Sequence, residues 1–295
     1  MGQYRFDGMA ALVTGAGSGL GRQHATQLAQ RGAKVMINDI GTRDGQPSAK
    51  KLAEELRAQG LTAEFNTRSV GEESGAVGAV EDTINAFGKI DILVNNAGAG
   101  VPEKTQDTTT ENFRFMLEVH LYSTFWTTRT ALKTMRAQNY GRIVNTSSAL
   151  GAYGSANSCA YVTAKAGIIG LTRATWLDNE DKDIRANALL PVAETPMAQA
   201  WFDANPHLRE TYNLDTALVS PVVLFLAHKD CPLNGETIAG AGGRAARAFR
   251  AATQGYHNPN LSVEDLFANV DQIMDTDGFR ILKNSQAQYE MIKPK

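Results

Sequence analysis

The alternation of short apolar runs with longer helical stretches constrains the fold of this chain more than any other feature. Runs rich in valine and isoleucine recur up to about residue 240, and stretches with helical spacing separate them. We expect strands at 10–13, 34–38, 62–66, 91–94, 141–146, 184–190 and 236–239. Strands that alternate with helices form βαβ units, which build a parallel sheet with helices on both faces. The pattern predicts a single-domain, doubly wound, Rossmann-like α/β fold with about seven strands.

The chain divides into a main domain and a C-terminal extension. Its 295 residues fit one large α/β domain, which we expect to occupy residues 1–245. Residues 246–295 follow a stretch rich in glycine, alanine and arginine, and we expect a last polar helix over 262–274. We expect this extension to be partly helical and regard it as a candidate for packing at a subunit interface.

Composition excludes several classes of protein. The net charge is −2 at pH 7, which argues against nucleic acid as the main partner because binding to phosphates usually needs a basic excess. The most apolar stretch, 217–227, is too short to span a membrane, and the N-terminus has no charged and apolar leader. The two cysteines, Cys159 and Cys231, fit no metal-binding pattern. We therefore expect a cytoplasmic protein with no metal site and no membrane or nucleic-acid partner.

A glycine-rich loop follows the first expected strand directly and opens a helix. The residues expected to bind a phosphate group there are Gly15, Gly17, Ser18, Gly19, Leu20 and Gly21. Glycine permits a tight turn and a close approach of the backbone to a ligand, and a helix N-terminus offers free N–H groups to a pyrophosphate. The spacing TGxxxGxG differs from the common dinucleotide fingerprint GxGxxG, and a plain tight turn is the alternative.

An acidic residue, Asp39, ends the second expected strand, 20 residues after Gly19. A carboxylate at this place accepts hydrogen bonds from the ribose hydroxyls of adenosine and repels a 2′-phosphate. Asp39 therefore predicts NAD in preference to NADP. Two alternatives stay open: Arg43, four residues later, could accommodate a phosphate, or Asp39 is a simple turn residue.

Three further residues have the chemistry of an alcohol-oxidising site. Ser148 follows the strand 141–146, and Tyr161 and Lys165 are four residues apart, so both lie on one face of a helix. Hydride transfer at a carbinol carbon needs a proton acceptor, and a phenol with a pKa of about 10 is too weak a base near neutral pH unless a cation favours the phenolate. Lys165 can supply that charge, and Ser148 can bind the substrate oxygen. A surface pair is the alternative for Tyr161 and Lys165.

Together with the glycine loop, Asn95-Asn96-Ala97-Gly98 and Pro191 to Thr195, these motifs resemble the short-chain dehydrogenase/reductase family over about residues 8–245. The resemblance implies one dinucleotide-binding and catalytic domain without a separate substrate domain. It implies Tyr161 as catalytic acid/base and Ser148 as ligand of the substrate oxygen, while Lys165 lowers the pKa of Tyr161 and binds the nicotinamide ribose. The residues that it adds to the expected cofactor site are Ser69, Val70, Asn95, Ala97, Gly98, Pro191 and Thr195.

The chain departs from the family pattern at two positions. His120, in the expected helix 111–138, stands where most members have an asparagine whose backbone carbonyl holds a water of the proton relay. The backbone of His120 can do the same and its side chain could join the relay, so we include it among the candidate catalytic residues. A plain helix residue is the alternative. Val192 replaces the usual glycine after Pro191, so the geometry of that loop is not predicted.

Several stretches resemble one branch of the family more specifically. They are 38–41, 119–125, 138–154 and 240–243, and they are similar to the (3R)-hydroxyacyl-CoA dehydrogenase part of the type 2 peroxisomal multifunctional enzymes, also known as 17β-hydroxysteroid dehydrogenases. The expected substrate is therefore bulky and apolar. Aromatic residues in the segments expected around the substrate are Tyr153, Trp201, Phe202 and Tyr212. Packing in the core or in a lid is the alternative for these side chains.

Three arginines with a spacing of three are expected to share one helix face. They are Arg244, Arg247 and Arg250. Binding of a CoA phosphate or a substrate carboxylate is one interpretation, and a solvated or subunit-facing surface is the other.

Two classes of function stay open. The first is an NAD-dependent oxidoreductase that interconverts a secondary alcohol and a ketone, acting on a 3-hydroxyacyl-CoA or hydroxysteroid, or on another class such as terpenoid or aryl carbinols. The second is a dinucleotide-binding sensor or scaffold without turnover. In family members the helices that correspond to 111–138 and 159–179 pack against a partner subunit, so we predict a homodimer or homotetramer.

Overall fold

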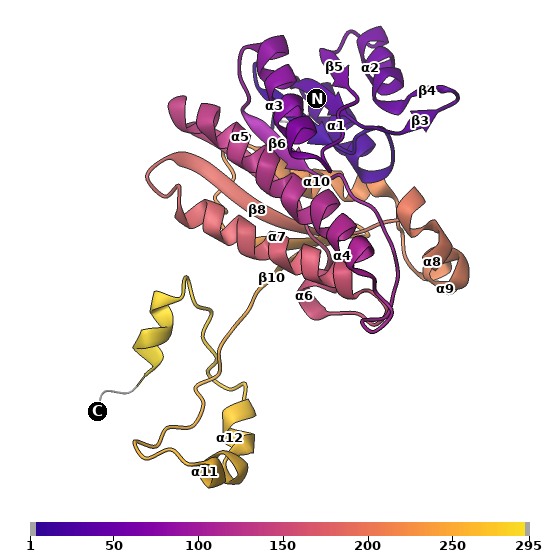
Figure 1. Ribbon diagram of the computed structural model, residues 1–295. Helices are drawn as coiled ribbons and strands as arrows, with labels where there is room; N and C mark the ends of the chain where they lie inside the picture. The colour runs from indigo at the N-terminus through magenta and orange to yellow at the C-terminus, as the bar shows by residue number, and fades with distance from the viewer. Residues whose placement is uncertain (1–3, 293–295) are drawn as a thin grey trace. The chain divides into compact units, whose positions relative to one another are not determined.

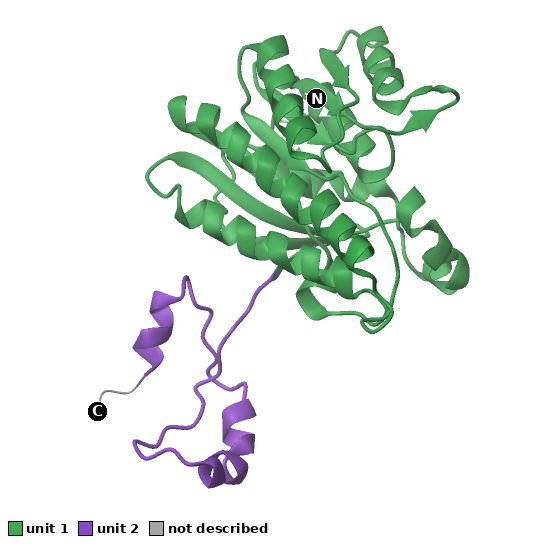
Figure 2. Cartoon of the chain, viewed as in Figure 1, with its two compact units in different colours: residues 1–247 green, residues 248–295 purple. Residues whose placement is uncertain are grey.

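The computed structural model describes residues 4–292, which divide into two compact units between residues 247 and 248 (Figure 2). The first unit contains the whole of the predicted Rossmann-like domain. None of the described helices is long and apolar enough to cross a lipid bilayer.

An eight-stranded sheet forms the centre of the first unit (Figure 1), in the order β10-β9-β8-β7-β6-β1-β2-β5. Its strands are β1 (Ala10–Thr14), β2 (Lys34–Asn38), β5 (Ala63–Asn66), β6 (Ile92–Asn95), β7 (Tyr140–Thr146), β8 (Asp183–Val192), β9 (Thr237–Ala241) and β10 (Arg244–Ala248). The seven strands from β5 to β9 in this order pair in parallel. The strand order reverses between β1 and β6, which is where open sheets of this kind bind ligands. The predicted fold class is confirmed.

Helices cover both faces of the sheet. The longer ones are α1 (Gly19–Gln30), α2 (Ser48–Ala58), α3 (Glu73–Phe87), α5 (Ser123–Ala137), α7 (Cys159–Leu177) and α10 (Ser220–Ala227). Successive residues of a strand point to opposite faces, so Val13 packs in one apolar cluster with α1, α2 and α10, whereas its neighbour Leu12 packs in another with α3 and α5. Burial on both faces explains why the strands are continuous apolar runs.

The prediction of about seven strands is low by one. Gly242 and Gly243, with φ of 54° and 79°, form a two-residue turn that leads the chain back beside β9 as β10. The segment RAARA contains no β-branched or aromatic residue that would indicate a strand. A short hairpin, β3 (Thr42–Arg43) with β4 (Gln46–Pro47), was also not predicted; it turns at Asp44-Gly45.

The expectation that the three arginines share a helix face is wrong. Arg244 and Arg247 belong to the strand β10, where a spacing of three residues places them on opposite faces. Arg247 forms an ion pair with Glu236, 2.7 Å away. Arg250 follows the strand.

The helix predicted over 111–138 is continuous but irregular. It consists of α4 (Thr110–Met116), a π-helical segment η1 (Leu117–Tyr122) and α5. His120 lies in η1 and is buried. Such π-helical turns occur frequently at functional sites.

The second unit has little core of its own. Its helical segments are α11 (Val263–Ala268), α12 (Val270–Met274) and η4 (Gln286–Met291), so the single helix predicted over 262–274 is corrected to two short ones that meet at Asn269. Ser262 and Asp265 form a capping box at the start of α11. Ala252 and Arg280 pair as an antiparallel bridge, and the rings of Phe249 and Phe279 stack. No described residue of this unit is buried.

Candidate active site

The predicted site residues gather where the parallel strands end. The glycine loop follows β1, Asp39 follows β2, and the segment from Asn95 to Gly98 closes β6. Ser148 follows β7, and Thr195 follows β8. Because all these strands are parallel, their carboxyl ends meet at one edge of the sheet, beside the switch point between β1 and β6.

The glycine loop requires glycine for steric reasons. Gly15 has a φ of 63°, and a Cβ atom there would lie 2.8 Å from the Cα atom of Ala97. A Cβ atom at Gly17 would lie 2.9 Å from the carboxyl carbon of Asp39. The loop ends at Ser18, whose side chain does not cap α1. The first N–H groups of α1 thus remain available, as binding of a pyrophosphate at a helix N-terminus requires.

Asp39 joins the glycine loop to the end of β2. One of its carboxylate oxygens accepts a hydrogen bond from the N–H of Gly17 at 2.8 Å, and the other accepts one from the N–H of Gly41 at 2.6 Å. Ser48, at the start of α2, donates both its hydroxyl and its N–H to the carbonyl of Gly41, each at 2.9 Å. Sequence reasoning missed Ser48, since a serine before a helix suggests only a cap.

Asn95, which ends β6, and Asn96, which follows it, have different roles. Asn96, which was not among the predicted site residues, donates to the carbonyl oxygens of Thr14 and Gly15 at 3.1 and 3.2 Å. The hydroxyl oxygen of Thr14 in turn accepts hydrogen bonds from the N–H groups of Asn96 and Ala97. These bonds hold the glycine loop against the end of β6.

Asn95 is buried and engaged inside the protein. Its amide donates to Asn145 at 2.9 Å and to Thr128 at 3.2 Å, and its carbonyl accepts a hydrogen bond from Thr127 at 2.7 Å. Both amide hydrogens are thus used within the protein. The side chain connects β6, β7 and α5 beneath the site, which differs from the expected direct contact with a cofactor.

Tyr161 and Lys165 lie one turn apart on α7, as predicted. The side chain of Lys165 is buried, its Nζ donates to the carbonyl of Thr146 at 2.8 Å, and the Nζ lies 5.6 Å from the centre of the Tyr161 ring. Burial lowers the pKa of Lys165 to about 7 because removal from water disfavours the ammonium. Lys165 can therefore gain or lose a proton near neutral pH.

Ser148 and Tyr161 are hydrogen-bonding neighbours. Burial raises the pKa of Tyr161, and the hydrogen bond with Ser148 partly offsets this by lowering it. The pKa of Tyr161 is thus shifted opposite to the direction expected from Lys165, because burial of the phenol is the larger effect. Ser148 also accepts a hydrogen bond from the N–H of Leu150 at 3.1 Å, which fixes the orientation of its side chain.

The side chain of His120 contacts the catalytic candidates. Its ring stands edge-on to that of Tyr161, and it lies close to Gly98, where a Cβ atom would be 2.9 Å from Nδ1. Burial, and then the charge of Lys165, hold the pKa of His120 well below its usual range. The imidazole is therefore neutral in the folded protein.

The loop after β8 faces the glycine loop. Thr195 accepts a hydrogen bond from the N–H of Ala198, and a Cβ atom at Gly19 would lie 3.5 Å from the Cβ of Thr195. Pro191 lies within β8, next to Gly240 of β9. Ser69 and Val70 follow β5, with Val70 buried.

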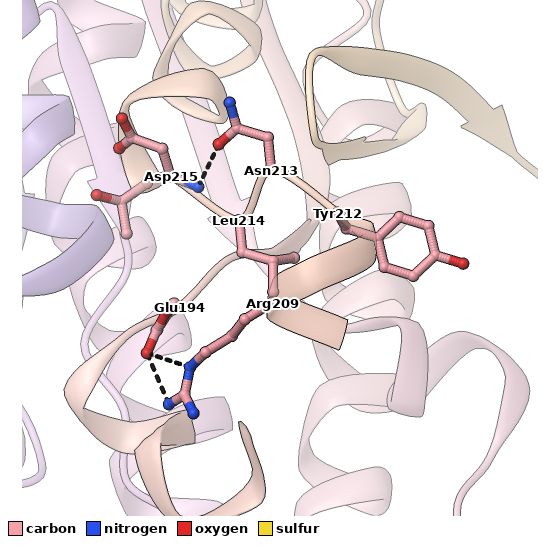
Figure 3. Close-up of a pocket in the computed structure, with 7 residues that line it drawn as sticks. Glu194, Arg209, Tyr212, Asn213, Leu214 and Asp215 are labelled. Atoms are coloured by element: carbon pink, nitrogen blue, oxygen red, sulfur yellow. Dashed lines mark hydrogen bonds and ion pairs between the residues drawn. The ribbon is translucent and has the colours of Figure 1, made fainter. Parts of the chain in front are cut away.

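A cavity of about 570 Å³ opens in the segment that follows Thr195 (Figure 3). Glu194 and Arg209 form an ion pair at its wall, at 2.7 Å, and Tyr212 also lines it. Of the four aromatic residues expected near a substrate, Tyr153, Trp201 and Tyr212 are exposed. Phe202 is 2% exposed, so it packs inside the protein, as the alternative interpretation held.

Comparison with known proteins identifies the family. The family model described as short chain dehydrogenase matches residues 9–206, which carry the glycine loop, Ser148, Tyr161 and Lys165. The chain belongs to the short-chain dehydrogenase family. It is therefore an oxidoreductase acting on CH–OH groups, and the family binds a nicotinamide dinucleotide. The resemblance found in the sequence is confirmed.

Individual relatives agree with this assignment. The chain is 35% identical over 285 residues to peroxisomal multifunctional enzyme type 2 of Drosophila melanogaster, covering 91% of this chain and 46% of the relative. A putative short-chain type dehydrogenase/reductase of Mycobacterium tuberculosis is 35% identical, with 92% and 95% coverage. A crystal structure of a short chain dehydrogenase from Mycobacterium avium has a TM-score of 0.78 at 31% identity, with 91% and 95% coverage. The chain thus spans about half the length of the Drosophila relative.

Proposed function

We propose that this short-chain dehydrogenase is an NAD-dependent enzyme that interconverts a secondary alcohol and a ketone. The observation that carries the proposal is the cluster of Ser148, Tyr161 and Lys165 at the strand ends, next to a glycine loop shaped for a pyrophosphate. When bound, NAD⁺ supplies the acceptor for the hydride that leaves the carbinol carbon. A hydroxyl, a phenol and a buried amine in this arrangement supply the proton chemistry that accompanies it.

The chain's residues divide the work between binding and proton transfer. Ser148 binds and orients the substrate oxygen, and Tyr161 takes its proton as the alcohol becomes a ketone. Lys165 provides the nearby positive charge that favours the phenolate and binds the nicotinamide ribose. In the reverse direction, Tyr161 donates the proton to the oxygen of the ketone.

The proposed cofactor site is built from the segments that end β1, β2, β5, β6 and β8. It comprises the glycine loop with Asp39, Ser69, Val70, Ala97, Gly98, Pro191 and Thr195. Asn95 supports this site indirectly, through its hydrogen bonds to β7 and α5. The preference for NAD rests on Asp39, whose carboxylate lies beside Gly17. A 2′-phosphate near this carboxylate would meet a like charge. Arg43 is exposed on the hairpin β3–β4 and is the residue that could offset that repulsion.

We propose a bulky, apolar substrate of the 3-hydroxyacyl-CoA or hydroxysteroid type. Support comes from the exposed side chains of Tyr153, Met197 and Trp201 and from the likeness to the Drosophila relative. Met197 lies in the segment that follows Thr195, and its side chain approaches Gly100 in the segment that follows β6.

The experiment that tests this function measures NADH formation from NAD⁺ with a panel of secondary alcohols. The panel contains 3-hydroxyacyl-CoAs, 17β-hydroxysteroids, terpenoid alcohols and aryl carbinols, and each is repeated with NADP⁺. Turnover of one class with NAD⁺ is the expected result. Tight binding of NADH without turnover of any class would instead favour a dinucleotide-binding sensor or scaffold.

We also propose that the protein forms a homodimer or homotetramer through α5 and α7. A groove between these helices is lined by apolar side chains, including Phe125, Leu132 and Leu171. The second unit is a further candidate for a subunit interface because it exposes large apolar side chains such as Phe267 and Met274. Apolar surface of this kind is typical of interfaces. A cytoplasmic location stays a prediction.

A further inference from the structure

Ser48 is a buried residue at the base of the hairpin β3–β4. The chain leaves for the hairpin after Gly41 and returns at Pro47, which pairs with Thr42. Just beyond that pair, the hydroxyl and the N–H of Ser48 both donate to the carbonyl of Gly41, at 2.9 Å each. Ser48 is 5% exposed. Because a carbonyl oxygen has two lone pairs, these two bonds use both of them and fix the position of Gly41.

Gly41 in turn orients the carboxylate of Asp39. The N–H of Gly41 donates to one carboxylate oxygen at 2.6 Å, and the N–H of Gly17 donates to the other at 2.8 Å. The carboxylate is therefore held between the glycine loop and the residue that Ser48 anchors. A carboxylate has about four lone-pair sites, so each oxygen keeps an acceptor site for a further donor. The direction of these sites depends on the position of Gly41.

The side chain of Ser48 also packs against the glycine loop. A Cβ atom at Gly17 would lie 2.6 Å from the Cβ atom of Ser48 and 2.9 Å from the carboxyl carbon of Asp39. A Cβ atom at Gly41 would lie 3.5 Å from the Ser48 hydroxyl and 2.9 Å from an Asp39 carboxylate oxygen. The glycine loop, the end of β2 and the start of α2 thus meet around this one hydroxyl.

We propose that Ser48 helps to select the cofactor: by fixing Gly41, it holds the Asp39 carboxylate in the orientation that favours NAD over NADP. This inference rests on the proposed NAD-dependent function. In this orientation the carboxylate can accept hydrogen bonds from the hydroxyls of an adenosine ribose, whereas a 2′-phosphate would bring a like charge and no hydroxyl donor. Hydrogen bonds weaken steeply with misalignment, so a carboxylate that is free to turn discriminates less. Ser48 acts through Asp39 and is therefore a positioning residue.

Substitution of Ser48 by alanine tests this role by binding alone, without turnover. Ser48→Ala removes one oxygen atom and keeps the backbone N–H that closes the hairpin. Fluorescence titrations with NADH and with NADPH give two dissociation constants. We expect the Kd for NADPH divided by the Kd for NADH to fall about threefold to tenfold, because a displaced carboxylate forfeits about one hydrogen bond to the ribose.

Thr83→Val is the matched control. Thr83 is also buried, and its hydroxyl also donates to a backbone carbonyl, that of Ala79 within α3, at 2.8 Å. We expect this variant to keep the Kd ratio of the wild type. Thermal unfolding of both variants compares their stabilities, so that a change of the ratio can be separated from a general loss of stability.

Two double variants identify the group through which Ser48 acts. In the Asp39→Asn background the discriminating charge is already absent, so we expect Ser48→Ala to change the ratio little. In the Arg43→Ala background we expect the full effect of Ser48→Ala, because Arg43 lies on the exposed hairpin. Coupling to Asp39 without coupling to Arg43 distinguishes a positioning role from a structural one.

Four results would overturn the inference. They are an unchanged ratio in Ser48→Ala, an equal fall in Thr83→Val, an effect that persists in full in the Asp39→Asn background, and an effect that disappears in the Arg43→Ala background. A wild-type protein that binds neither dinucleotide, or binds NADPH more tightly, would contradict the proposed function and this inference with it. A wild-type protein that prefers NADH, with any of the four results, would contradict the inference alone.

Discussion

The ring of His120 stands edge-on to the ring of Tyr161, with centroids 5.2 Å apart and an angle of 86° between the planes. One ring comes from the π-helical segment η1 and the other from the first turns of α7. Lys165 lies one turn further on, and of the three side chains those of His120 and Lys165 are buried. Tyr161, the proposed proton acceptor, thus packs directly against a buried side chain of η1.

Replacement of Tyr161 by phenylalanine tests the proton acceptor. Tyr161→Phe removes one oxygen atom and keeps the ring contact with His120, so we expect the fold and NADH binding to persist. Loss of a general base typically lowers the rate by about 10²–10⁴-fold, and we expect kcat to fall by this amount. Steady-state kinetics and NADH fluorescence titration measure the two quantities. A variant that keeps most of its kcat would show that another group takes the proton.

Replacement of Asp39 by asparagine tests the preference for NAD over NADP. Asp39→Asn keeps the side-chain shape and one acceptor oxygen for Gly17 or Gly41 but removes the charge, so we expect the ratio of kcat/KM for NAD⁺ over NADP⁺ to fall about tenfold or more. Arg43→Ala is the matched control, and it should leave NAD⁺ use unchanged. A ratio that responds to Arg43→Ala and not to Asp39→Asn would assign the selectivity to the hairpin.

The buried amine of Lys165 predicts a dependence of stability on pH. Its pKa falls from 10.5 to about 7 on folding because of burial. Between these values the unfolded chain binds a proton that the folded protein releases, so this group makes the folded state more stable as the pH rises from about 7 to 10.5. Below about pH 7 Lys165 is charged in both states, and burial of its ammonium then destabilises the folded protein by its full amount, on the order of a few kcal/mol.

Lys165→Met removes this group while keeping a similar shape. We expect the variant to gain stability relative to the wild type at about pH 6, and to keep only part of that advantage at about pH 9. Urea unfolding of both proteins at the two pH values measures the difference. An identical pH dependence of the two proteins would show that Lys165 does not titrate in this range.

Asn95, the last residue of β6, and its neighbour Asn96 provide a matched pair. Asn95→Ala leaves the side-chain oxygen of Asn145 in the core without its donor, so we expect a loss of about 1–3 kcal/mol in the free energy of unfolding. Asn96→Ala loosens the glycine loop, so we expect weaker NADH binding and a smaller loss of stability. Denaturant unfolding and NADH titration of both variants measure these effects. If Asn95→Ala instead weakened NADH binding more than Asn96→Ala did, Asn95 would contact the cofactor directly.

The apolar groove between α5 and α7 predicts self-association. We expect light scattering to give the mass of a dimer or tetramer, and Leu132→Glu to shift it toward the monomer, since a charge in an apolar interface is unfavourable. Glu111→Lys, in the exposed first turn of α4, is a control for the introduction of a charged side chain. A wild-type monomer would contradict the proposed interface.

The sequence was sufficient for the main features of the fold because the strands between helices are buried on both faces. Runs such as Ala10–Val13 are apolar throughout, and the glycine loop and Asp39 mark where two strands end. The same reasoning placed Ser148, Tyr161 and Lys165 together, since the strand end and one helix turn bring them to the same edge of the sheet.

Other features depend on interactions that a single sequence does not indicate. The strand β10 consists of alanine and arginine, which have little preference for strands. The π-helical segment around His120 and the hydrogen bonds of Thr124 to its carbonyl have no local sequence pattern. Asn95 and Asn96 stand side by side in the chain, and only the tertiary structure shows that one lies in the core and the other holds the glycine loop.

The most direct test of the proposed function follows the hydride itself. The wild-type protein is incubated with NAD⁺ and each alcohol of the panel, deuterated at the carbinol carbon, and the NADH formed is analysed by mass spectrometry. We predict that one class of alcohol yields NADH that carries the deuterium. Absence of deuterium in NADH for every class, in a protein that binds NADH tightly, would contradict the assignment as an NAD-dependent alcohol dehydrogenase.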